Sequence, residues 1–360
     1  MGDPPALPDV IKRSLSLPRE AGTPAAAAAR DLIAAHLSSL GYEVTLQRFS
    51  FSPSSLNALP VFGAGLGALA LVVLPFLFSP HVPAWSAAAV WLTGLSALGV
   101  LSVGIGLGWV SSEHSIRQDA NLVATRGKGR PRRWIVAHLD SKAQGHSMAG
   151  RLVAVWVLVV ATGALTLLTL FRLVGEVAPL WLASGVGLAP VAGWLASRGR
   201  LRGFSPGARD NASGIVAALA AAGHGRDPGT GILITGAEEF GLVGARIFAQ
   251  LTPEMQELEF LNLDTLDDQG RLYLVSHDAR GERLARSLES CLSGLGLPLR
   301  HRRLPWGIFV DSAPLARAGA ASITLGRLTW ATLRRIHTPA DTAEDFTYRT
   351  AEAVGKALVS

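Results

Sequence analysis

The sequence predicts an α/β domain that is interrupted twice by apolar helical hairpins. Patterns typical of strands and helices alternate from residue 215 to the C-terminal region, as in α/β proteins. No Asp, Glu, Lys or Arg lies between Arg48 and Glu113, and residues 152–171 and 177–197 are two further uncharged runs. Acidic and histidine side chains stand at the ends of several apolar, strand-like runs. The chain therefore combines a polar site on an α/β domain with segments suited to a membrane.

The first 56 residues open the α/β domain. Residues 1–22 are rich in proline and polar groups, which predicts a poorly ordered arm, and they lack the apolar stretch of a signal peptide. Residues 25–40 are rich in alanine with leucine and isoleucine at helical spacing, and Gly41 is suited to end that helix. Residues 42–49 alternate as in a half-buried strand. We expect the first part of the ordered domain to cover residues 23–56.

Two hairpins of long apolar helices are predicted next. Residues 57–78 and 84–110 are each long enough to cross a hydrocarbon layer about 30 Å thick, which needs about 20 residues, and residues 152–171 and 177–197 form a second pair. The alternative is buried helices in a large soluble core, but soluble helices rarely lack a charged face over such lengths. We predict transmembrane hairpins at 57–110 and 151–197, with four spans, and further parts of the α/β domain at 111–150 and 198–360.

Basic residues predict the orientation of these spans. Two hairpins leave every polar segment on one side, and the hairpin tips carry only Arg172 as a cation. The basic residues flanking the spans on the other side are Arg48, Arg117, Lys142, Arg151, Arg198, Arg200 and Arg202. By the positive-inside rule the α/β domain faces the cytoplasm, as in a protein of the cell inner membrane. Anionic membrane lipid near these residues would also account for the net charge of +6, whereas no basic stripe with interleaved aromatic residues supports nucleic acid as a partner.

The polar segments around the second hairpin continue the domain. Apolar runs at 121–124 and 134–140 flank a basic turn at 126–133, which predicts a β-hairpin that ends in a polar site. After the second hairpin, a helix is expected over 215–222, and residues 231–235 have the pattern of a buried strand bounded by glycine.

Glu238 and Glu239 stand at the end of that strand. Burying two adjacent carboxylates costs roughly several kcal/mol unless they share a cation or one is protonated, so a metal or acid/base site is one interpretation. The other is a solvated pair where a strand turns into a loop. The pair alone leaves both interpretations open.

Other potential metal ligands hold comparable positions. His138 and Asp140 end one apolar run, Asp264 closes another, Asp210 precedes a helix and His337 lies in a loop. Ligands of α/β proteins bind at the carboxyl ends of strands, so we expect these groups to converge. Their nitrogen and carboxylate donors suit zinc. Because His138 and Asp140 are two residues apart, they share a face of a strand, and the Asp140 carboxylate is placed to accept a hydrogen bond from the imidazole.

Five motifs together resemble the co-catalytic dizinc exopeptidases, which include bacterial leucyl aminopeptidases and glutamate carboxypeptidase. The motifs are AHLDS at 137–141, RDNASG at 209–214, GAEEFGLVGA at 236–245, NLD at 262–264 and HTPADT at 337–342. The resemblance extends from about residue 25 to the C-terminal end, with the hairpins as insertions. It implies a zinc-exopeptidase-like mixed sheet flanked by helices, and a membrane-bound aminopeptidase acting on peptide substrates.

The resemblance also implies a role for each motif residue. His138 and Asp264 would bind one zinc ion, Glu239 and His337 a second, and Asp210 would bridge the two Zn2+. Glu238 would be the general base that takes a proton from the metal-bridging water and passes it to the leaving amine. We assign Asp140 to catalysis as well, as the partner of His138.

Three points stay open at this stage. Some family members carry a tyrosine that helps hold the oxyanion, where this chain has Ile336. Asp311 is expected either to reach the site or to cap a helix over 313–318. Two other functions are a non-catalytic membrane scaffold, which would not need the ligands that the sequence carries, and a glutaminyl cyclase-like acyltransferase that works with one zinc.

Overall fold

The computed structural model describes residues 7–106, 116–175, 180–305 and 308–360, and the chain divides into two compact units. Unit 1 comprises Met1–Phe51, Ile116–Ala143 and Gly203–Ser360, and unit 2 comprises Ser52–Ser115 and Gln144–Arg202. Each unit is therefore assembled from segments that are separated in the sequence. Residues 107–110 and 177–179, which were expected in the second and fourth spans, lie outside the described residues.

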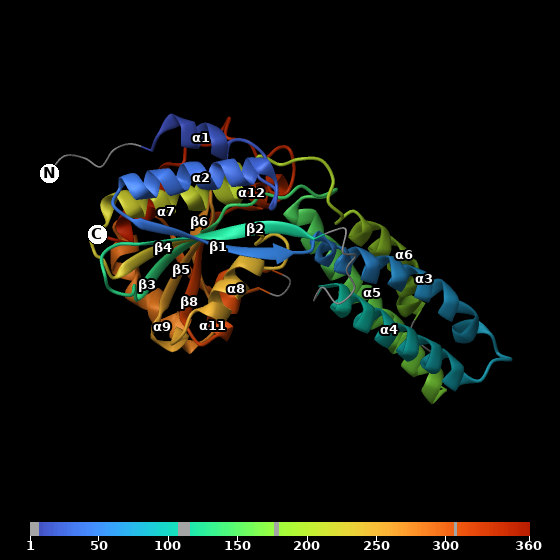
Figure 1. Cartoon of the computed structure of the whole chain (residues 1–360). Helices are drawn as coiled ribbons and strands as arrows, with labels where there is room; N and C mark the ends of the chain where they lie inside the picture. Colours follow the sequence, from blue (N-terminus) through green and yellow to red (C-terminus); the bar gives the residue numbers. More distant parts are fainter. Residues whose placement is uncertain (1–6, 107–115, 176–179, 306–307) are drawn as a thin grey trace. The chain divides into compact units, whose positions relative to one another are not determined.

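Unit 1 is built on a mixed eight-stranded sheet with the order β1-β2-β4-β3-β5-β8-β6-β7 (Figure 1). The strands are β1 (Glu43–Phe51), β2 (Arg117–Thr125), β3 (Arg133–His138), β4 (Thr230–Thr235), β5 (Glu259–Leu266), β6 (Arg271–Ser276), β7 (Leu299–Arg303) and β8 (Ala321–Leu328). Strands β4, β3, β5 and β8 run parallel at the centre, while β2 and β6 join them antiparallel. The predicted mixed α/β sheet is confirmed, and its parallel centre brings the ends of β3, β4 and β5 to one edge.

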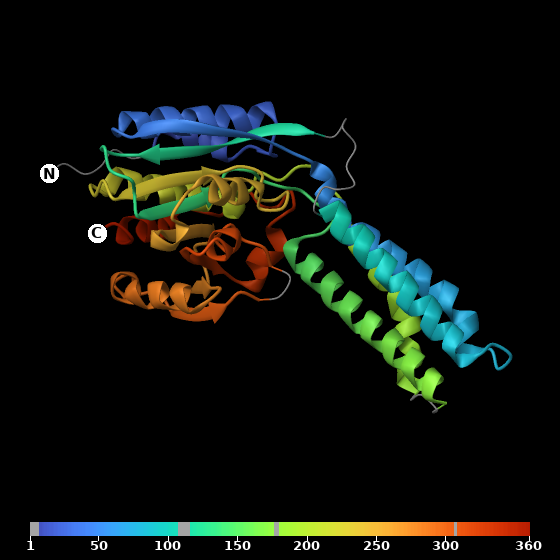
Figure 2. The same cartoon turned by 60° about the horizontal axis from the view of Figure 1, so that its bottom comes forward.

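Helices cover both faces of this sheet (Figure 1 and Figure 2). Alternate residues of β3 enter different apolar cores: Ile135 and Ala137 pack under α2, α7 and α13, whereas Trp134 and Val136 pack with Phe248 under α8 and α11. The helices of unit 1 are α1 (Asp9–Leu15), α2 (Pro24–Ser39), α7 (Ser213–His224), α8 (Val243–Leu251), α9 (Ala279–Ser287), α10 (Glu289–Ser293), α11 (Ser312–Arg317), α12 (Trp330–Arg335) and α13 (Arg349–Ala357).

The N-terminal segment differs from the poorly ordered arm that the sequence predicts. Residues 9–15 form helix α1, and its Ile11 and Leu15, four residues apart, are both buried in the core under α2. So short a helix is marginal by itself, and the burial of this apolar face accounts for its order. Arg19, which follows α1, is buried as well.

Strands β2 and β3 do not form the predicted hairpin, because β4 lies between them in the sheet. Strand β3 pairs in parallel with β4, with Ile135 opposite Ile232, and on its other side with β5. Residues 134–138 of β3 are all buried as a result. Burial between two parallel neighbours outweighs the local turn pattern of residues 126–133.

Unit 2 consists of apolar helices that share one core. They are α3 (Ala58–Phe78), α4 (Ala84–Gly106), α5 (Met148–Val174) and α6 (Ser184–Ser197), with short turns η1 (Pro53–Asn57) and η3 (Leu180–Ala183). Each of the four helices contributes buried side chains to that core, for example Leu66, Trp91, Leu165 and Ala192. Helices α3 and α6 approach closely, since a Cβ added to Gly193 would lie 2.6 Å from the carbonyl oxygen of Gly63.

Among the described residues, three segments of unit 2 are long and apolar enough to cross a membrane. They are Pro53–Phe78, Ala84–Gly106 and Met148–Val174. The fourth apolar helix described, Trp181–Ser197, is shorter than the other three and than the predicted span at 177–197.

Candidate metal centre

The carboxyl edge of the parallel strands collects the predicted ligands. They are His138 at the end of β3, Glu239 in the loop after β4, Asp264 within β5, Asp210 in the turn η4 (Ala208–Ala212) before α7, and His337 in the loop after α12. Strand β5 continues past Asp264 to Leu266, with a register shift against β8 between Leu263 and Leu266. Residues from five separate segments thus meet at one edge of the sheet.

These side chains form two overlapping groups whose ligand atoms lie within 4.8 Å of one another. In the first, His138 Nε2 lies 3.2 Å from Asp210 Oδ1 and 3.9 Å from Asp264 Oδ1. In the second, His337 Nε2 lies 3.1 Å from Asp210 Oδ2 and 3.1 Å from Glu239 Oε1. Asp210 belongs to both groups and directs a different oxygen to each.

The donor set fits a divalent metal such as zinc. Histidine nitrogen and carboxylate oxygen are zinc ligands, and four of these five side chains are at least nine-tenths buried, with Asp264 partly exposed. Glu239 Oε1 is buried, and the group nearest to hydrogen-bond distance among the described residues is the candidate ligand His337, whose Nε2 lies 3.1 Å away. Buried carboxylates crowded in this way need a shared cation or a proton.

Electrostatics separates Glu238 from its neighbour. Burial, opposed in part by His138 and reinforced by the charge of Glu239, raises the pKa of Glu238 well above its ordinary value. Burial also acts on Glu239, but His337 and Lys142 outweigh it and lower the pKa of Glu239 to about 2. Glu238 belongs to neither ligand group. The two adjacent carboxyls are therefore suited to different tasks, one to proton transfer and one to ligation.

The loop that carries this pair is held by Asp140. Its two carboxylate oxygens accept hydrogen bonds from the backbone N–H groups of Glu238 and Glu239, each at 3.1 Å. His138 Nδ1 lies 3.0 Å from the backbone oxygen of Asp140 but 3.8 Å from its Oδ1. Asp140 thus meets the imidazole through its backbone, and its carboxylate supports the glutamates rather than the histidine as expected from the sequence.

The same loop is closed by Asn121, which lies on β2. Its Oδ1 accepts a hydrogen bond from the backbone N–H of Gly236 at 3.1 Å, and its Nδ2 donates to the carbonyl of Gly244 at 2.8 Å. Gly244 in turn donates from its backbone N–H to the carbonyl of Gly236. The sequence offered no signal for this role of Asn121, because Gly236 and Gly244 lie more than 100 positions away.

Asp210 is held by the last motif of the chain. The carboxylate of Asp341 accepts hydrogen bonds from the backbone N–H groups of Arg209 at 2.9 Å and of Asp210 at 3.1 Å. Burial, which the backbone N–H of Arg209 partly opposes, raises the pKa of Asp341 to about 6. The Arg209 side chain bonds Asp267 at 3.2 Å. The RDNASG and HTPADT motifs are therefore joined directly beside the candidate ligand Asp210.

A family comparison agrees with this geometry. The sequence model of Peptidase family M28 matches residues 194–360, which include Asp210, the Glu238–Glu239 pair, Asp264 and His337.

Residues 194–360 are similar to an M28 peptidase domain.

The resemblance inferred from the motifs, and the assignment to zinc-dependent exopeptidases at the level of the family, are thereby confirmed. His138, on β3, lies outside the matched residues but within the same site. No curated protein matches the sequence.

Solved structures at 18% sequence identity or less share the fold of the chain. An aminopeptidase from Aneurinibacillus sp. strain AM-1 is 17% identical, with a TM-score of 0.56 and coverage of 97% of this chain and 92% of that chain. The zinc aminopeptidase BSAP from Bacillus subtilis is 18% identical, also with a TM-score of 0.56, over 99% and 95% of the two chains. A glutaminyl cyclase from Fimbriiglobus ruber is 13% identical, with a TM-score of 0.55, over 100% and 97%.

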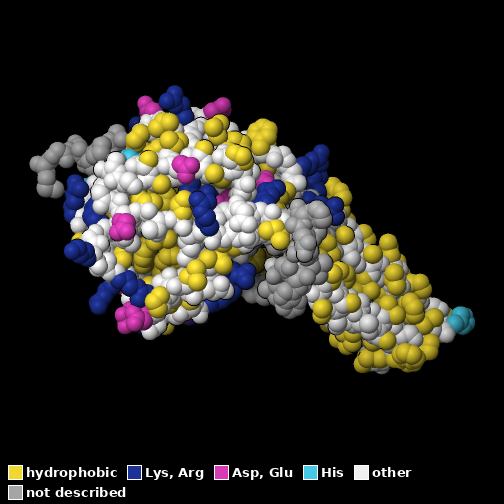
Figure 3. Space-filling view, in the orientation of Figure 1, with side chains coloured by type: hydrophobic (Ala, Val, Ile, Leu, Met, Phe, Trp, Pro, Cys, Tyr) yellow, Lys and Arg dark blue, Asp and Glu magenta, His cyan; other side chains and the backbone are white. Residues whose placement is uncertain are grey.

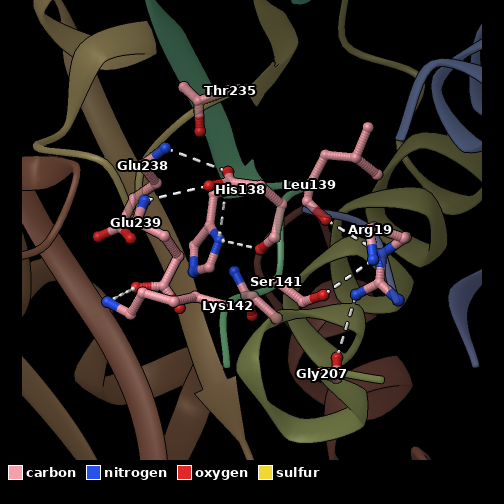
Figure 4. Close-up of polar contacts among 12 residues, drawn as sticks. Arg19, His138, Leu139, Ser141, Lys142, Gly207, Thr235, Glu238 and Glu239 are labelled. Carbon is pink, nitrogen blue, oxygen red and sulfur yellow. Dashed lines mark hydrogen bonds and ion pairs between the residues drawn. The ribbon is translucent and has the colours of Figure 1, made fainter. Parts of the chain in front are cut away.

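Lys142 adjoins the candidate metal centre, although its position in the sequence suggests a cation beside the spans. It was counted among the cations flanking the spans, but its side chain is buried and its Nζ lies 2.5 Å from Glu239 Oε2 (Figure 4). Lys142 directly follows the motif AHLDS at 137–141, and this adjacency is the sequence signal that pointed to the site. Lys142 leaves Glu239 with one oxygen for a metal and the other on an ammonium group.

Asp311 and Ile336 complete the surroundings. Asp311 does not cap helix α11, since its fully buried side chain instead accepts a hydrogen bond from the Thr235 hydroxyl, at the end of β4. Burial raises its pKa to about 6. Ile336 is buried, and its hydrocarbon side chain offers no hydrogen bond to an oxyanion.

Proposed function

We propose that the chain is a membrane-bound, zinc-dependent aminopeptidase that hydrolyses peptide bonds with Glu238 as general base. One observation carries the proposal: two three-residue ligand groups share Asp210, and an unligated glutamate adjoins the ligand Glu239. The solved aminopeptidases of similar fold support the choice of substrate.

The ligands divide between two ions in this proposal. His138 and Asp264 would hold one zinc, Glu239 and His337 the other, and Asp210 both, through different oxygens. Bound zinc acidifies water and polarises a carbonyl oxygen.

The remaining chemistry falls to the chain's own groups. Glu238 takes the proton of the water that attacks the scissile carbonyl and delivers it to the leaving amine, and its raised pKa suits both steps. Asp140 keeps the Glu238 backbone in place while this proton moves.

Paired glutamate variants test the assignment. Glu238→Gln should keep bound zinc, measured by elemental analysis, and lose hydrolysis of aminoacyl substrates by about 100-fold or more. Glu239→Gln should lose both hydrolysis and bound zinc, because the substitution removes a ligand. A Glu238→Gln variant that hydrolyses peptides at the wild-type rate would overturn the role of Glu238.

We further propose that unit 2 spans the bilayer four times, with α6 as the fourth span. The proposal is supported by apolar side chains exposed on each of its helices, such as Leu71, Val100, Trp156 and Val191, and by the apolar surface that Figure 3 shows. Membrane lipid is then the partner of this surface. Without Lys142, the exposed Arg198, Arg200 and Arg202 still favour a cytoplasmic α/β domain.

Two introduced cysteines test this topology in a Cys291→Ser background. Lys128→Cys lies in an exposed turn of unit 1, and His81→Cys lies in the exposed turn between α3 and α4. A membrane-impermeant maleimide added to intact cells should label His81→Cys and spare Lys128→Cys. The reverse pattern would refute the orientation, and labelling of both would refute the spans.

The Lys142–Glu239 contact favours one alternative, a glutaminyl cyclase-like acyltransferase with a single zinc. Lys142 provides, beside Glu239, a positive charge that a second ion would otherwise supply. About one metal per chain, together with cyclisation of an N-terminal glutamine, would support this alternative. About two metals and release of N-terminal residues would exclude it.

A further inference from the structure

Arg19 has an unusual environment for an arginine. Its side chain has 0 % exposure, and within the described residues no carboxylate lies at ion-pair distance. The guanidinium donates instead to backbone carbonyls: Nε to Leu139 (3.0 Å), Nη2 to Gly207 (3.1 Å), and Nη1 to Pro206 (2.8 Å), Leu17 (2.8 Å) and Leu15. An arginine buried in this way is stabilised only while these acceptors stay in place.

These carbonyls belong to the two loops that present candidate ligands. Leu139 follows His138 directly, and Gly207 lies three residues before Asp210. Figure 4 shows the guanidinium between Leu139 and Gly207. A single planar group therefore spans the gap between the end of β3 and the turn that leads into α7.

The backbone of Arg19 reinforces this link through Ser141. The Arg19 N–H donates to Ser141 Oγ at 2.9 Å, and its carbonyl accepts from the Ser141 N–H at 3.1 Å. Ser141 Oγ donates in turn to the carbonyl of Ser205, in the second loop, at 2.9 Å. Both loops are thus joined twice, once by the side chain of Arg19 and once by Ser141.

We propose that Arg19 is a positioning residue of the metal centre, which holds the His138 loop and the Asp210 loop at the separation where both residues bind one ion. The separation in question is the 3.2 Å between His138 Nε2 and Asp210 Oδ1. Lysine cannot replace this function fully, because an ammonium group has three donors and no planar fork, whereas a guanidinium has five. The inference rests on the proposed metal site and is independent of peptide hydrolysis.

Metal titration of the purified full-length chain tests the inference. Metal-free wild type, Arg19→Met and Arg19→Lys are titrated with Co2+, read by its visible absorption, and with Zn2+ in competition with a chelator. Arg19→Met should bind 10–100-fold more weakly and with a changed Co2+ spectrum, as is typical when a group that orients a ligand is lost. Arg19→Lys should lie between Arg19→Met and wild type.

Ile11→Ala is the matched control. Ile11 lies in the same N-terminal segment and is 2% exposed, but it packs in the apolar core, so its truncation should lower the unfolding midpoint and leave the Co2+ affinity and spectrum unchanged.

The inference would be overturned if Arg19→Met had the metal affinity and Co2+ spectrum of wild type. It would also be overturned if Ile11→Ala lost as much metal affinity as Arg19→Met at an equal loss of stability. If Arg19→Met does not fold, wild-type metal binding by Arg19→Lys overturns it. Metal binding by wild type without peptide hydrolysis would defeat the proposed function alone, whereas a wild type that binds no metal would defeat both.

Discussion

The substitution Asp140→Asn tests how the glutamate pair is held. The carboxylate of Asp140 is 1% exposed and accepts one backbone N–H at each oxygen, both at 3.1 Å. An asparagine keeps one acceptor and directs an N–H donor at the other backbone N–H. One of the two amides, that of Glu238 or Glu239, therefore loses its partner inside the protein.

The size of the effect follows from these contacts. A buried N–H left without an acceptor costs about 1–3 kcal/mol, so the free energy of unfolding should fall by about that amount. The loop should also shift, which would weaken metal binding by about 10–100-fold through Glu239. Burial raises the pKa of Asp140 to about 7, so the comparison belongs near pH 8, where the wild-type carboxylate is charged.

The assay combines urea unfolding of the metal-free chain with zinc competition binding. Asp268→Asn is the matched control, because Asp268 also accepts two backbone amides, those of Thr347 at 2.8 Å and Thr350 at 3.2 Å, but is not a candidate ligand. We expect both variants to lose stability and only Asp140→Asn to lose zinc affinity. Equal zinc affinity in the two variants would refute the positioning role of Asp140.

Three further predictions concern the same site. Burial raises the pKa of Asp311 from 3.8 to about 6, so between about pH 4 and pH 6 the metal-free folded chain keeps a proton there that the unfolded chain has released. The free energy of unfolding should therefore fall as the pH rises from about 4 to 6. Asp311→Asn should flatten that part of a plot of melting temperature against pH. A Cβ on Gly244 would lie 2.3 Å from Asn121 Oδ1, so Gly244→Ala should lower the free energy of unfolding by about 1–3 kcal/mol in urea titrations, and an unchanged midpoint would contradict the tight closure of the loop. Zinc added at about 100 times its dissociation constant should stabilise the metal-free chain by about 2.7 kcal/mol in the same titration, and no shift would contradict a metal site.

Much of the fold could be predicted because its signals are local. The helix expected over 25–40 corresponds to α2, the strand expected over 42–49 to β1, and the buried strand at 231–235 to β4. The prediction of a hairpin was wrong for residues 121–124 and 134–140, because strand order depends on partners far along the chain. Strand β4 comes between β2 and β3 only after more than 90 intervening residues.

For the site, too, the sequence determined the local features and the tertiary structure decided the contacts between distant segments. The sequence by itself determined the types of the candidate ligands, the glutamate pair at a strand end and the long uncharged runs, because chemistry and hydropathy belong to single residues and short stretches. Only the tertiary structure decided that Asp140 holds the glutamate backbone, that Lys142 is buried on Glu239 and that Arg19 joins two loops. These contacts depend on which backbone groups are left unpaired at the loop ends, and that is known only once the strands are in their order.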